Sequence, residues 1–420
     1  MIKEKMGVPQ SWKMHSLHDL LFFQEGPGVR NWQFKDKGVK LLNVRNINNN
    51  KINLDATSVY ISEEEAYGKY SHFLADAGDL VIASSGIVVE NFHNKIAFIK
   101  EEHLPLCMNT STIRFKIAKE DYISIEYFRL FLGTNLFKSQ LKKLITGSAQ
   151  LNFGPSHLKK IKIPLPPLDD QIRIAHLLGK VEGLIAQRKQ NLQQLDDMLK
   201  SVFLEMFGDP VRNYKNHKTS ILGAFITHLT SGGWGWAKYY SNNGKRFIRS
   251  LDVQMNTIGS KDIVYVDPPD NKETERTRVE PGDILLTITG SKIGRVCFVP
   301  LEFEEAYVSQ HVAIIRTKDI NPIFLSYYLS MPNCGQRIIS KQQYGQAKPG
   351  LNLTQISNFE ILKPDIDIQN HFAAIVEKIE GIKSRYQQSL TDLNNLYGAL
   401  SQQAFKGELD LSRIQLEKTI

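Results

Sequence analysis

Three things are scarce in this sequence: cysteine, long apolar runs and an apolar leader. Its 420 residues hold three cysteines, Cys107, Cys297 and Cys334, and no two of them form a CxxC pair. So low a count fits a reducing cytoplasm and argues against a disulfide framework or a zinc knuckle. No apolar run approaches the roughly 18 residues of a membrane span, and residues 1–7 lack the apolar region of a secretory signal. We therefore expect a cytoplasmic chain that does not cross a membrane.

The signatures of several enzyme classes are also missing. The sequence has no GxxxxGK[ST] phosphate loop, and its scattered histidines lack the spacing of metal ligands. Residues 267–270 (Asp-Pro-Pro-Asp) are superficially similar to the Asp-Pro-Pro-Tyr motif of amino-methyltransferases. The fourth residue of that motif stacks on a flipped base, and Asp270 has no ring for this step. We therefore expect a non-catalytic chain with no metal site and no cofactor of its own.

The net charge of the chain is positive. Lys and Arg number 52 and Asp and Glu number 44, which gives +8 at pH 7 and a pI near 9.1. Such a surplus favours a polyanionic partner, most often nucleic acid. A basic protein without such a partner has the same composition, so charge alone leaves both alternatives open.

The clearest feature of the chain is a repeat. Residues 73–86 (FLADAGDLVIASSG) are similar to residues 278–290 (RVEPGDILLTITG), about 200 positions later. Leu151-Asn152-Phe153 likewise returns as Leu351-Asn352-Leu353. A repeat of this length exceeds the roughly 50 residues of a solenoid unit. It indicates a duplicated domain with its own helix, and it predicts recognition of two similar but non-identical targets.

Each repeat ends in a long leucine-rich stretch. Between residues 171 and 206, apolar side chains recur mostly at steps of three and four, a heptad seam interrupted at Arg188. The second stretch begins near residue 368 and ends at Gly407. Helices of this length, about 54 Å each, need a partner for their apolar stripe. We expect the two helices to pair antiparallel as a coiled coil; packing of each helix on its own domain is the alternative.

The segments ahead of these helices are typical of mixed α/β domains. Strands are expected at 79–83, 96–99 and 111–117 and again at 283–289, 294–299 and 312–316, and helices over 125–144 and from 321. Gly78-Asp79 and Gly282-Asp283 predict a turn before a buried strand. The hydroxyl side chains that follow these strands suit either phosphate contact or an ordinary turn.

These features together resemble a known family. Residues 163–168 (IPLPPL) and 171–175 (QIRIA) lead into the first helix, which ends in Phe207-Gly208-Asp209, and the second helix ends at 405–409 (FKGEL). With a Gly-Asp segment ahead of each helix, nearly the whole chain resembles the specificity subunits of Type I restriction-modification systems. The second lead-in, residues 361–365 (ILKPD), departs from the pattern because it lacks the Pro-Leu-Pro-Pro run.

The resemblance implies an α/β fold with two similar target-recognition domains, separated by two long antiparallel coiled-coil helices in a pseudo-twofold internal repeat. Each domain would read one half of a split, asymmetric site on double-stranded DNA, and the helices would set the spacer. Methyltransferase subunits, expected to be two, would dock with S-adenosylmethionine, and restriction subunits would bring ATP and Mg. A coiled-coil scaffold that does not contact DNA is the alternative, but it leaves the duplicated basic domains unexplained.

The expected organisation has five parts. They are a first recognition domain (1–165), a central helix (166–210), a second recognition domain (211–365), a distal helix (366–412) and a tail (413–420).

Recognition domains of this family vary too strongly for base-reading residues to be transferred, so candidates come from loop chemistry. Gln and Asn pair bidentately with adenine, and Arg and Lys with guanine; a well-ordered polar loop is the alternative. The candidates for DNA contact in the first domain are Arg45, Asn46, Ser84, Ser85, Lys143, Gln150 and Asn152. Those in the second domain are Arg249, Thr287, Thr289, Lys292, Lys341, Tyr344, Gln346 and Lys348.

Overall fold

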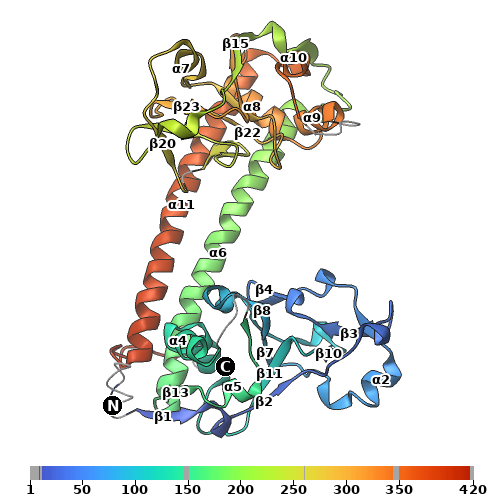
Figure 1. The fold of residues 1–420 in the computed structure, drawn as a ribbon, viewed down its shortest axis with the longest axis vertical. Coiled ribbons are helices and arrows are strands. Elements are labelled where there is room, and N and C mark those ends of the chain that lie inside the picture. Colours follow the sequence, from blue (N-terminus) through green and yellow to red (C-terminus); the bar gives the residue numbers. More distant parts are fainter. Residues whose placement is uncertain (1–8, 10–11, 146–150, 260, 344–349, 417–420) are drawn as a thin grey trace. The chain divides into compact units, whose positions relative to one another are not determined.

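The computed structural model describes residue 9 and residues 12–145, 151–259, 261–343 and 350–416. The chain forms two compact units, one of residues 1–187 with 390–420 and one of residues 188–389. Each unit holds one α/β domain and one segment of each long helix (Figure 1). The division therefore falls within the two helices, and each unit is described separately below.

The first unit contains two sheets of more than two strands. The larger is antiparallel, with the order β2 (Leu21–Glu25), β11 (Thr112–Ile117), β7 (Leu80–Ala83) and β9 (Ile96–Phe98). In the smaller sheet, β3 (Val39–Leu42) lies between β6 (Tyr60–Ile61) and a parallel partner, β10 (Leu106–Met108). The smaller sheet lies farther from the long helices than the larger one does (Figure 1). The expected strands are thus present, and β7 is buried at all four positions.

The second unit repeats this topology, with one strand more in its second sheet. Its antiparallel sheet has the order β15 (Ile226–Ser231), β24 (Val312–Thr317), β21 (Ile284–Thr287) and β22 (Val296–Phe298). A second sheet holds β16 (Tyr240–Ser241), β20 (Val264–Val266), β17 (Lys245–Ile248) and β23 (Ala306–Val308), and β17 runs parallel to β23 as β3 does to β10. The hairpin β4–β5 (Ile47–Asn48, Lys51–Ile52) has its counterpart in β18–β19 (Val253–Gln254, Thr257–Ile258). The internal repeat predicted from sequence is therefore a repeat of fold.

The two ends of each domain are joined by a short two-stranded sheet. In the first unit, β1 (Lys13–Ser16) pairs antiparallel with β13 (Lys162–Leu165). In the second, β14 (Lys218–Ile221) pairs in the same way with β25 (Glu360–Lys363). Each long helix follows directly on the second strand of its pair.

Short helices cover one side of each larger sheet. They are α3 (Ile125–Gly133), α4 (Asn135–Leu144) and α5 (Pro155–Leu158) in the first unit and α8 (Pro322–Ser330), α9 (Gly335–Gln343) and α10 (Leu353–Ser357) in the second. Two further helices, α2 (Glu63–Tyr67) and α7 (Lys272–Thr277), accompany the other sheets. The single helix expected over 125–144 is in fact two, because Thr134 has extended backbone and its hydroxyl caps α4 by accepting from Phe137 N at 3.1 Å.

Both predicted long helices are present, as α6 (Leu168–Phe207) and α11 (Ile366–Lys406). Their antiparallel course is clear in the second unit, where Phe207 contacts Phe372 (ring centroids 5.5 Å apart) while the earlier Asp196 pairs with the later Lys383 (2.7 Å). The interrupting Arg188 lies over the Tyr386 ring, 4.2 Å from its centroid. In each unit, the long helices therefore both pair with each other and pack on the domain. Their apolar stripe also contacts α3 in the first unit and α8 in the second.

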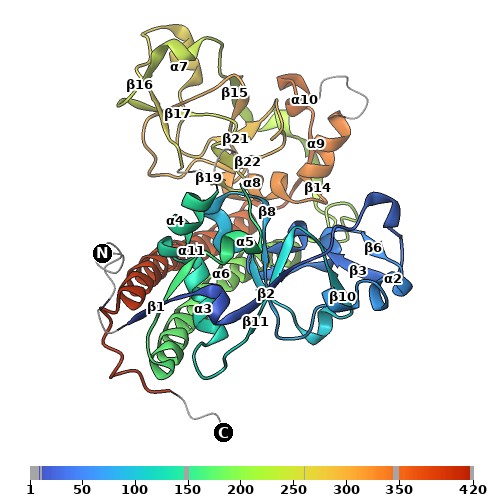
Figure 2. The same ribbon diagram turned by 60° about the horizontal axis from the view of Figure 1, so that its bottom comes forward.

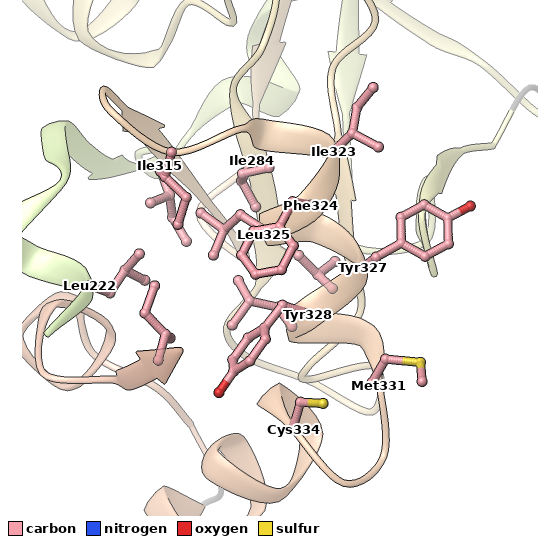
Figure 3. Packing of buried hydrophobic residues seen from close by; sticks show 14 of the residues in the cluster. Leu222, Ile284, Ile315, Ile323, Phe324, Leu325, Tyr327, Tyr328, Met331 and Cys334 are labelled. Atoms are coloured by element: carbon pink, nitrogen blue, oxygen red, sulfur yellow. The ribbon is translucent and has the colours of Figure 1, made fainter. Parts of the chain in front are cut away.

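The core of the second unit shows this double use of the seam. Phe324 of α8 stacks on Phe203 of α6 and lies 4.7 Å from Phe207, and all three rings are buried. Figure 3 shows Phe324 and Leu325 of α8 facing the sheet residues Ile284 and Ile315. In both general views, α8 lies closer to the long helices than α7 does (Figures 1 and 2). In the first unit, Tyr127 of α3 likewise stacks on Phe405 of α11 (5.0 Å).

A repeated glutamine connects each domain to the start of its helix. Gln171, fully buried, accepts from Ser124 N at 3.0 Å and donates to the carbonyl oxygens of Tyr122 and Pro166, both at 2.9 Å. Its counterpart Gln369, 1% exposed, accepts from Asn321 N at 2.9 Å and donates to Pro364 O at 2.8 Å. These bonds satisfy backbone groups at the start of α3 and α8 and so fix the direction in which each long helix leaves its domain.

Candidate nucleic-acid interface

The Gly-Asp motif of each repeat has a structural role, as predicted. Gly78 and Gly282 have φ of +88° and +83°, a left-handed conformation that favours glycine. The buried Asp79 accepts from Asp76 N at 3.0 Å and pairs with Arg114 of β11 at 3.3 Å. Asp283, also buried, accepts from Glu280 N at 2.7 Å and pairs with Arg316 of β24 at 2.8 Å. The Asp therefore closes a turn and clamps two neighbouring strands.

At the other end of this sheet, four segments of the first unit meet. Ser84 N, after β7, donates to Ser111 O (2.9 Å), and the Ser111 hydroxyl accepts from Val44 N (3.2 Å), next to Arg45. Ser85 Oγ and Gly86 N both donate to Asn152 Oδ1, at 2.8 and 3.1 Å, so β8 (Ser85–Ile87) pairs with β12 (Leu151–Asn152). Candidates far apart in sequence thus lie together at one edge.

The candidates of the first unit differ in exposure. Arg45, Lys143 and Asn152 are exposed and Ser85 is half-buried, so all four present polar atoms at the surface. Asn46 is fully buried, and its side chain accepts from Asn43 N (2.9 Å) and donates to Asn53 O (2.8 Å). The prediction that Asn46 contacts DNA does not fit this environment, because its amide already shapes the turn that carries Arg45. Ser84 is 1% exposed, so its predicted role in DNA contact does not fit either.

The second unit places equivalent segments at the equivalent edge. Ile288 N donates to His311 O and Leu351 N to Ile288 O, both at 2.9 Å, and Ser309 N donates to Ile248 O, next to Arg249, at 2.9 Å. Thr289 forms an isolated bridge with Gly350, and its hydroxyl is hydrogen bonded to His311 Nδ1. The two repeats therefore build the same edge from different side chains.

The second set of candidates is also divided by exposure. Lys341 on α9 is exposed, while Lys292, in the β21–β22 turn, and Thr289 are half-buried. Arg249 is engaged by Asp252 at 3.0 Å and by Asp262 O at 2.8 Å, and its bond to Asp252 raises the pKa of the guanidinium. Thr287 is fully buried within β21, so its predicted role in DNA contact does not fit. Gln150, Tyr344, Gln346 and Lys348 lie outside the described residues.

Sequence reasoning missed two side chains at this edge, Gln310 and His311. Gln310 Nε2 lies 3.1 Å from His311 Nε2, and His311 Nδ1 lies against the Thr289 hydroxyl. Both residues are half-buried in the turn before β24. A signal was available, because this turn corresponds to Thr110-Ser111 in the first repeat, but a lone histidine gave no reason to single it out.

A basic helix face adjoins the edge in the first unit. Lys138, Lys142 and Lys143 lie on α4, and Lys142 pairs with Glu90, whose pKa falls chiefly because of that hydrogen bond. Burial, followed by the nearby Lys138 charge, lowers the pKa of His93, so this histidine is neutral at pH 7. Lys143, in the last turn of the same helix, is exposed.

Two further properties bear on the kind of site. Among the residues that the structure describes, no group of three or more His, Cys, Asp or Glu side chains is placed to hold a metal ion. No helix in the described part of the chain is long and apolar enough to cross a membrane.

The sequence is similar to that of a known protein family. The family model of the Type I restriction modification DNA specificity domain matches residues 9–196 and 237–392. The specificity subunit of the Type I restriction enzyme EcoKI of Escherichia coli is 22% identical over 430 residues, which is 96% of this chain and 90% of that protein. The MjaVIII specificity subunit of Methanocaldococcus jannaschii is 27% identical over 201 residues, 48% of this chain and 46% of that one.

A solved structure supports the fold. The crystal structure of a Type I system S subunit from M. genitalium aligns with a TM-score of 0.56 at 14% identity and covers 95% of this chain and 98% of that one. The relatives are named as specificity subunits, which agrees with the expectation of a non-catalytic recognition chain. Since the two matched segments together span most of the sequence, this chain belongs to the family of Type I restriction-modification DNA specificity domains, as its motifs predicted.

Proposed function

We propose that this chain reads a split, asymmetric DNA site, with one half-site bound by each unit. The observation that carries the proposal is the repeated edge at the ends of β7 and β21, where loops from four parts of each repeat converge. In the first unit, exposed Arg45 and Asn152 line it with hydrogen-bonding groups suited to phosphates and base edges, and α4 carries the exposed Lys143. In the second, Thr289 and Gln310 lie on equivalent segments, and α9 carries the exposed Lys341.

The long helices would fix the spacer between the half-sites. Helix α6 has 40 residues and α11 has 41, so each is about 60 Å long. The helices would thus act as a ruler of fixed length, which requires that each helix keep one orientation to the domain that it leaves. The buried Gln171 and Gln369 meet this requirement, because they hold the start of each helix to its own domain. Polar residues on the outer faces of these helices would dock two methyltransferase subunits carrying S-adenosylmethionine. Restriction subunits with ATP and Mg would complete the assembly in the cytoplasm.

Methylation sequencing tests the whole proposal. The chain is produced with its methyltransferase in cells lacking other modification enzymes, and methylated positions are mapped across the genome. We expect one motif made of two unlike half-sites and a spacer of constant length. A contiguous motif, or methylation that does not depend on this chain, would contradict the proposal.

A salt titration tests the assigned edges. Each phosphate neutralised by a lysine contributes about 0.9 to the slope of log K against log salt. We expect Lys143→Ala and Lys341→Ala each to reduce the slope by about this amount. Lys119→Ala and Lys318→Ala are matched controls, because these exposed lysines follow the opposite ends of β11 and β24. An equal loss in the controls would show that the edges are not the binding surface.

A further inference from the structure

Two tryptophans are exposed in the loops that follow equivalent strands of the two repeats. Trp32 is 78% exposed and Trp234 is 82% exposed, whereas the other two tryptophans, Trp12 and Trp236, are 8% and 4% exposed. Trp32 follows the edge strand β2, and Trp234 follows its counterpart β15. Tryptophan is enriched at interfaces relative to the rest of the protein surface, because its large ring supplies contact area and its N–H can still find a partner.

The loops that carry these rings are held firmly. Before Trp32 comes Val29, buried in the core of the smaller sheet, and after it Gln33, whose buried amide donates to Tyr70 Oη at 3.1 Å. After Trp234 comes Trp236, which stacks on Phe247 (5.1 Å) and donates from Nε1 to Glu273 at 3.1 Å. Each exposed ring therefore stands on a loop whose neighbouring residues are fixed by the core.

Each loop also begins against the proposed DNA-binding edge of its own unit, at a glycine that comes six residues before Trp32 and two residues before Trp234. Gly26 N donates to Thr112 O (3.1 Å), and a Cβ at Gly26 would overlap the backbone of Asn109. Gly232 N donates to Val312 O (3.4 Å), and a Cβ there would overlap the backbone at Ser309. The turns that begin at Asn109 and Ser309 carry Ser111 and His311, which bond the strand ends at that edge. The same close approach of glycine thus recurs in both repeats.

We propose that Trp32 and Trp234 are apolar contacts for DNA, each packing its ring against the sugar and the exposed base edge of a nucleotide at the half-site bound by its own unit. Within the described residues, neither ring has an aromatic or cation–π partner in the protein, so both faces are available. Nearby exposed cations, Arg30 and Lys35 in one unit and Lys238 in the other, would hold the adjoining phosphates. The inference rests on the proposed function and adds an apolar component to a contact otherwise made by polar groups.

Fluorine NMR of the full chain labelled with 5-fluorotryptophan tests the proposal directly. The chain has four tryptophans, so four resonances are expected, assigned by Trp→Phe variants. The probe is a duplex with the bipartite motif found by methylation sequencing, and unlabelled methyltransferase adds no signal. We expect the Trp32 and Trp234 signals to shift and to lose their H2O–D2O isotope effect, while the signals of Trp12 and Trp236 stay. A duplex with one half-site scrambled should protect only one of the two rings.

Affinity measurements give an independent readout. Truncation of a tryptophan that anchors an interface weakens binding by about fivefold or more, so we expect Trp32→Ala and Trp234→Ala each to weaken binding about tenfold. Because the contact is apolar, the slope of log K against log salt should stay unchanged, unlike that of Lys143→Ala. Phe at either position should retain part of the affinity.

Exposed residues elsewhere in each unit provide controls. Tyr122, 57% exposed, follows the far end of β11, and Leu301, 80% exposed, follows the end of β22 away from Thr287. Their alanine variants should bind within about twofold of the unaltered chain, because neither side chain lies at the proposed edge. If the duplex binds with a steep salt dependence while Trp32 and Trp234 keep full solvent exposure, the inference fails and the proposed function stands. If the unaltered chain shows no salt-dependent binding, both fall.

Discussion

Single buried polar residues connect the parts of this protein. Gln171 and Gln369 recur at the same position of the repeat, and each joins the start of a long helix to the start of a shorter one. A buried amide whose donors and acceptor are all used is costly to replace, because its partners lose their bonds as well. The glutamine of the family motif is thus explained by architecture, without any role in contacting DNA.

Gln171→Glu should destabilise the first unit while conserving side-chain volume. A carboxylate cannot donate to Tyr122 O and Pro166 O, so we expect a loss of about 2–4 kcal/mol at pH 7. Burial raises the pKa of such a carboxyl in the folded state, so part of the stability should return as the pH falls and the group binds a proton. Thermal unfolding measures both effects. Gln190→Glu, on the exposed surface of α6, should change stability by less than about 0.5 kcal/mol.

The three cysteines should be unreactive in the folded protein. Burial raises the pKa of Cys107 and of Cys334 to about 12 from an ordinary value of 9.0, and it raises the pKa of Cys297 as well. The thiolate is the reactive form, so a thiol reagent at pH 8 should label none of the three until the chain is denatured. Rapid labelling of any one under native conditions would contradict this burial.

The same pKa shifts predict a loss of stability in alkali. The unfolded thiols ionise near pH 9, whereas folded Cys107 and Cys334 remain protonated until about pH 12. The folded state therefore binds more protons above pH 9, and its stability should decrease as the pH rises from about 9 to 12. Denaturant unfolding at pH 8 and pH 10 measures the difference, and replacement of both thiols by alanine should reduce it.

At the scale of elements, each unit depends on aromatic contacts made by the end of one long helix. Phe207 at the end of α6 lies 4.7 Å from Phe324 of α8 and 5.5 Å from Phe372 of α11. The first unit has the same arrangement, with Phe405 of α11 lying 5.0 Å from Tyr127 and 6.1 Å from Phe131, both of α3. The end of each long helix is thus packed into the domain that the other helix leaves.

Phe207→Ala should therefore destabilise the second unit by about 3–5 kcal/mol, the cost of a large cavity in a rigid aromatic cluster. Hydrogen exchange should become faster in α8 and in the adjoining segments of α6 and α11. Leu204→Ala is the control on the same helix turn, because Leu204 is 38% exposed and leaves little cavity. Equal effects of the two variants would mean that the ring cluster does not hold these helices together.

At the scale of the whole molecule, the proposed ruler makes a quantitative prediction. A heptad added to both α6 and α11 lengthens each by about 10.5 Å, roughly three base pairs of duplex, and keeps the seam in phase. Methylation sequencing should show a spacer longer by about three base pairs with unchanged half-sites. Adding four residues instead breaks the heptad phase and should reduce methylation. An unchanged spacer in the heptad variant would exclude the ruler.

Much of the architecture could be predicted because the same sequence pattern occurs in both halves of the chain. The Gly-Asp turns, the seam and the helix ends depend on local pattern, and the structure has them where expected. The edge could not be resolved from sequence, since burial there depends on distant contacts. Asn46, for example, has the right side chain to contact a base, but the structure shows that its amide is hydrogen bonded to Asn43 N and Asn53 O. Trp32 and Trp234 were overlooked because nothing local distinguishes an exposed ring from a buried one.

The pairing of β14 with β25 has a consequence for how such proteins change. The first and last strands of the second domain lie side by side, from Lys218 opposite Lys363 to Ile221 opposite Glu360, so the domain enters and leaves its helical frame through one narrow stem. A gene segment that begins at β14 and ends at β25 would encode the whole second domain. Such a segment could be inserted between the same two long helices of another chain. If each domain binds one half-site, as proposed above, exchange of this domain between genes would give new combinations of half-sites while α6 and α11 stay unchanged.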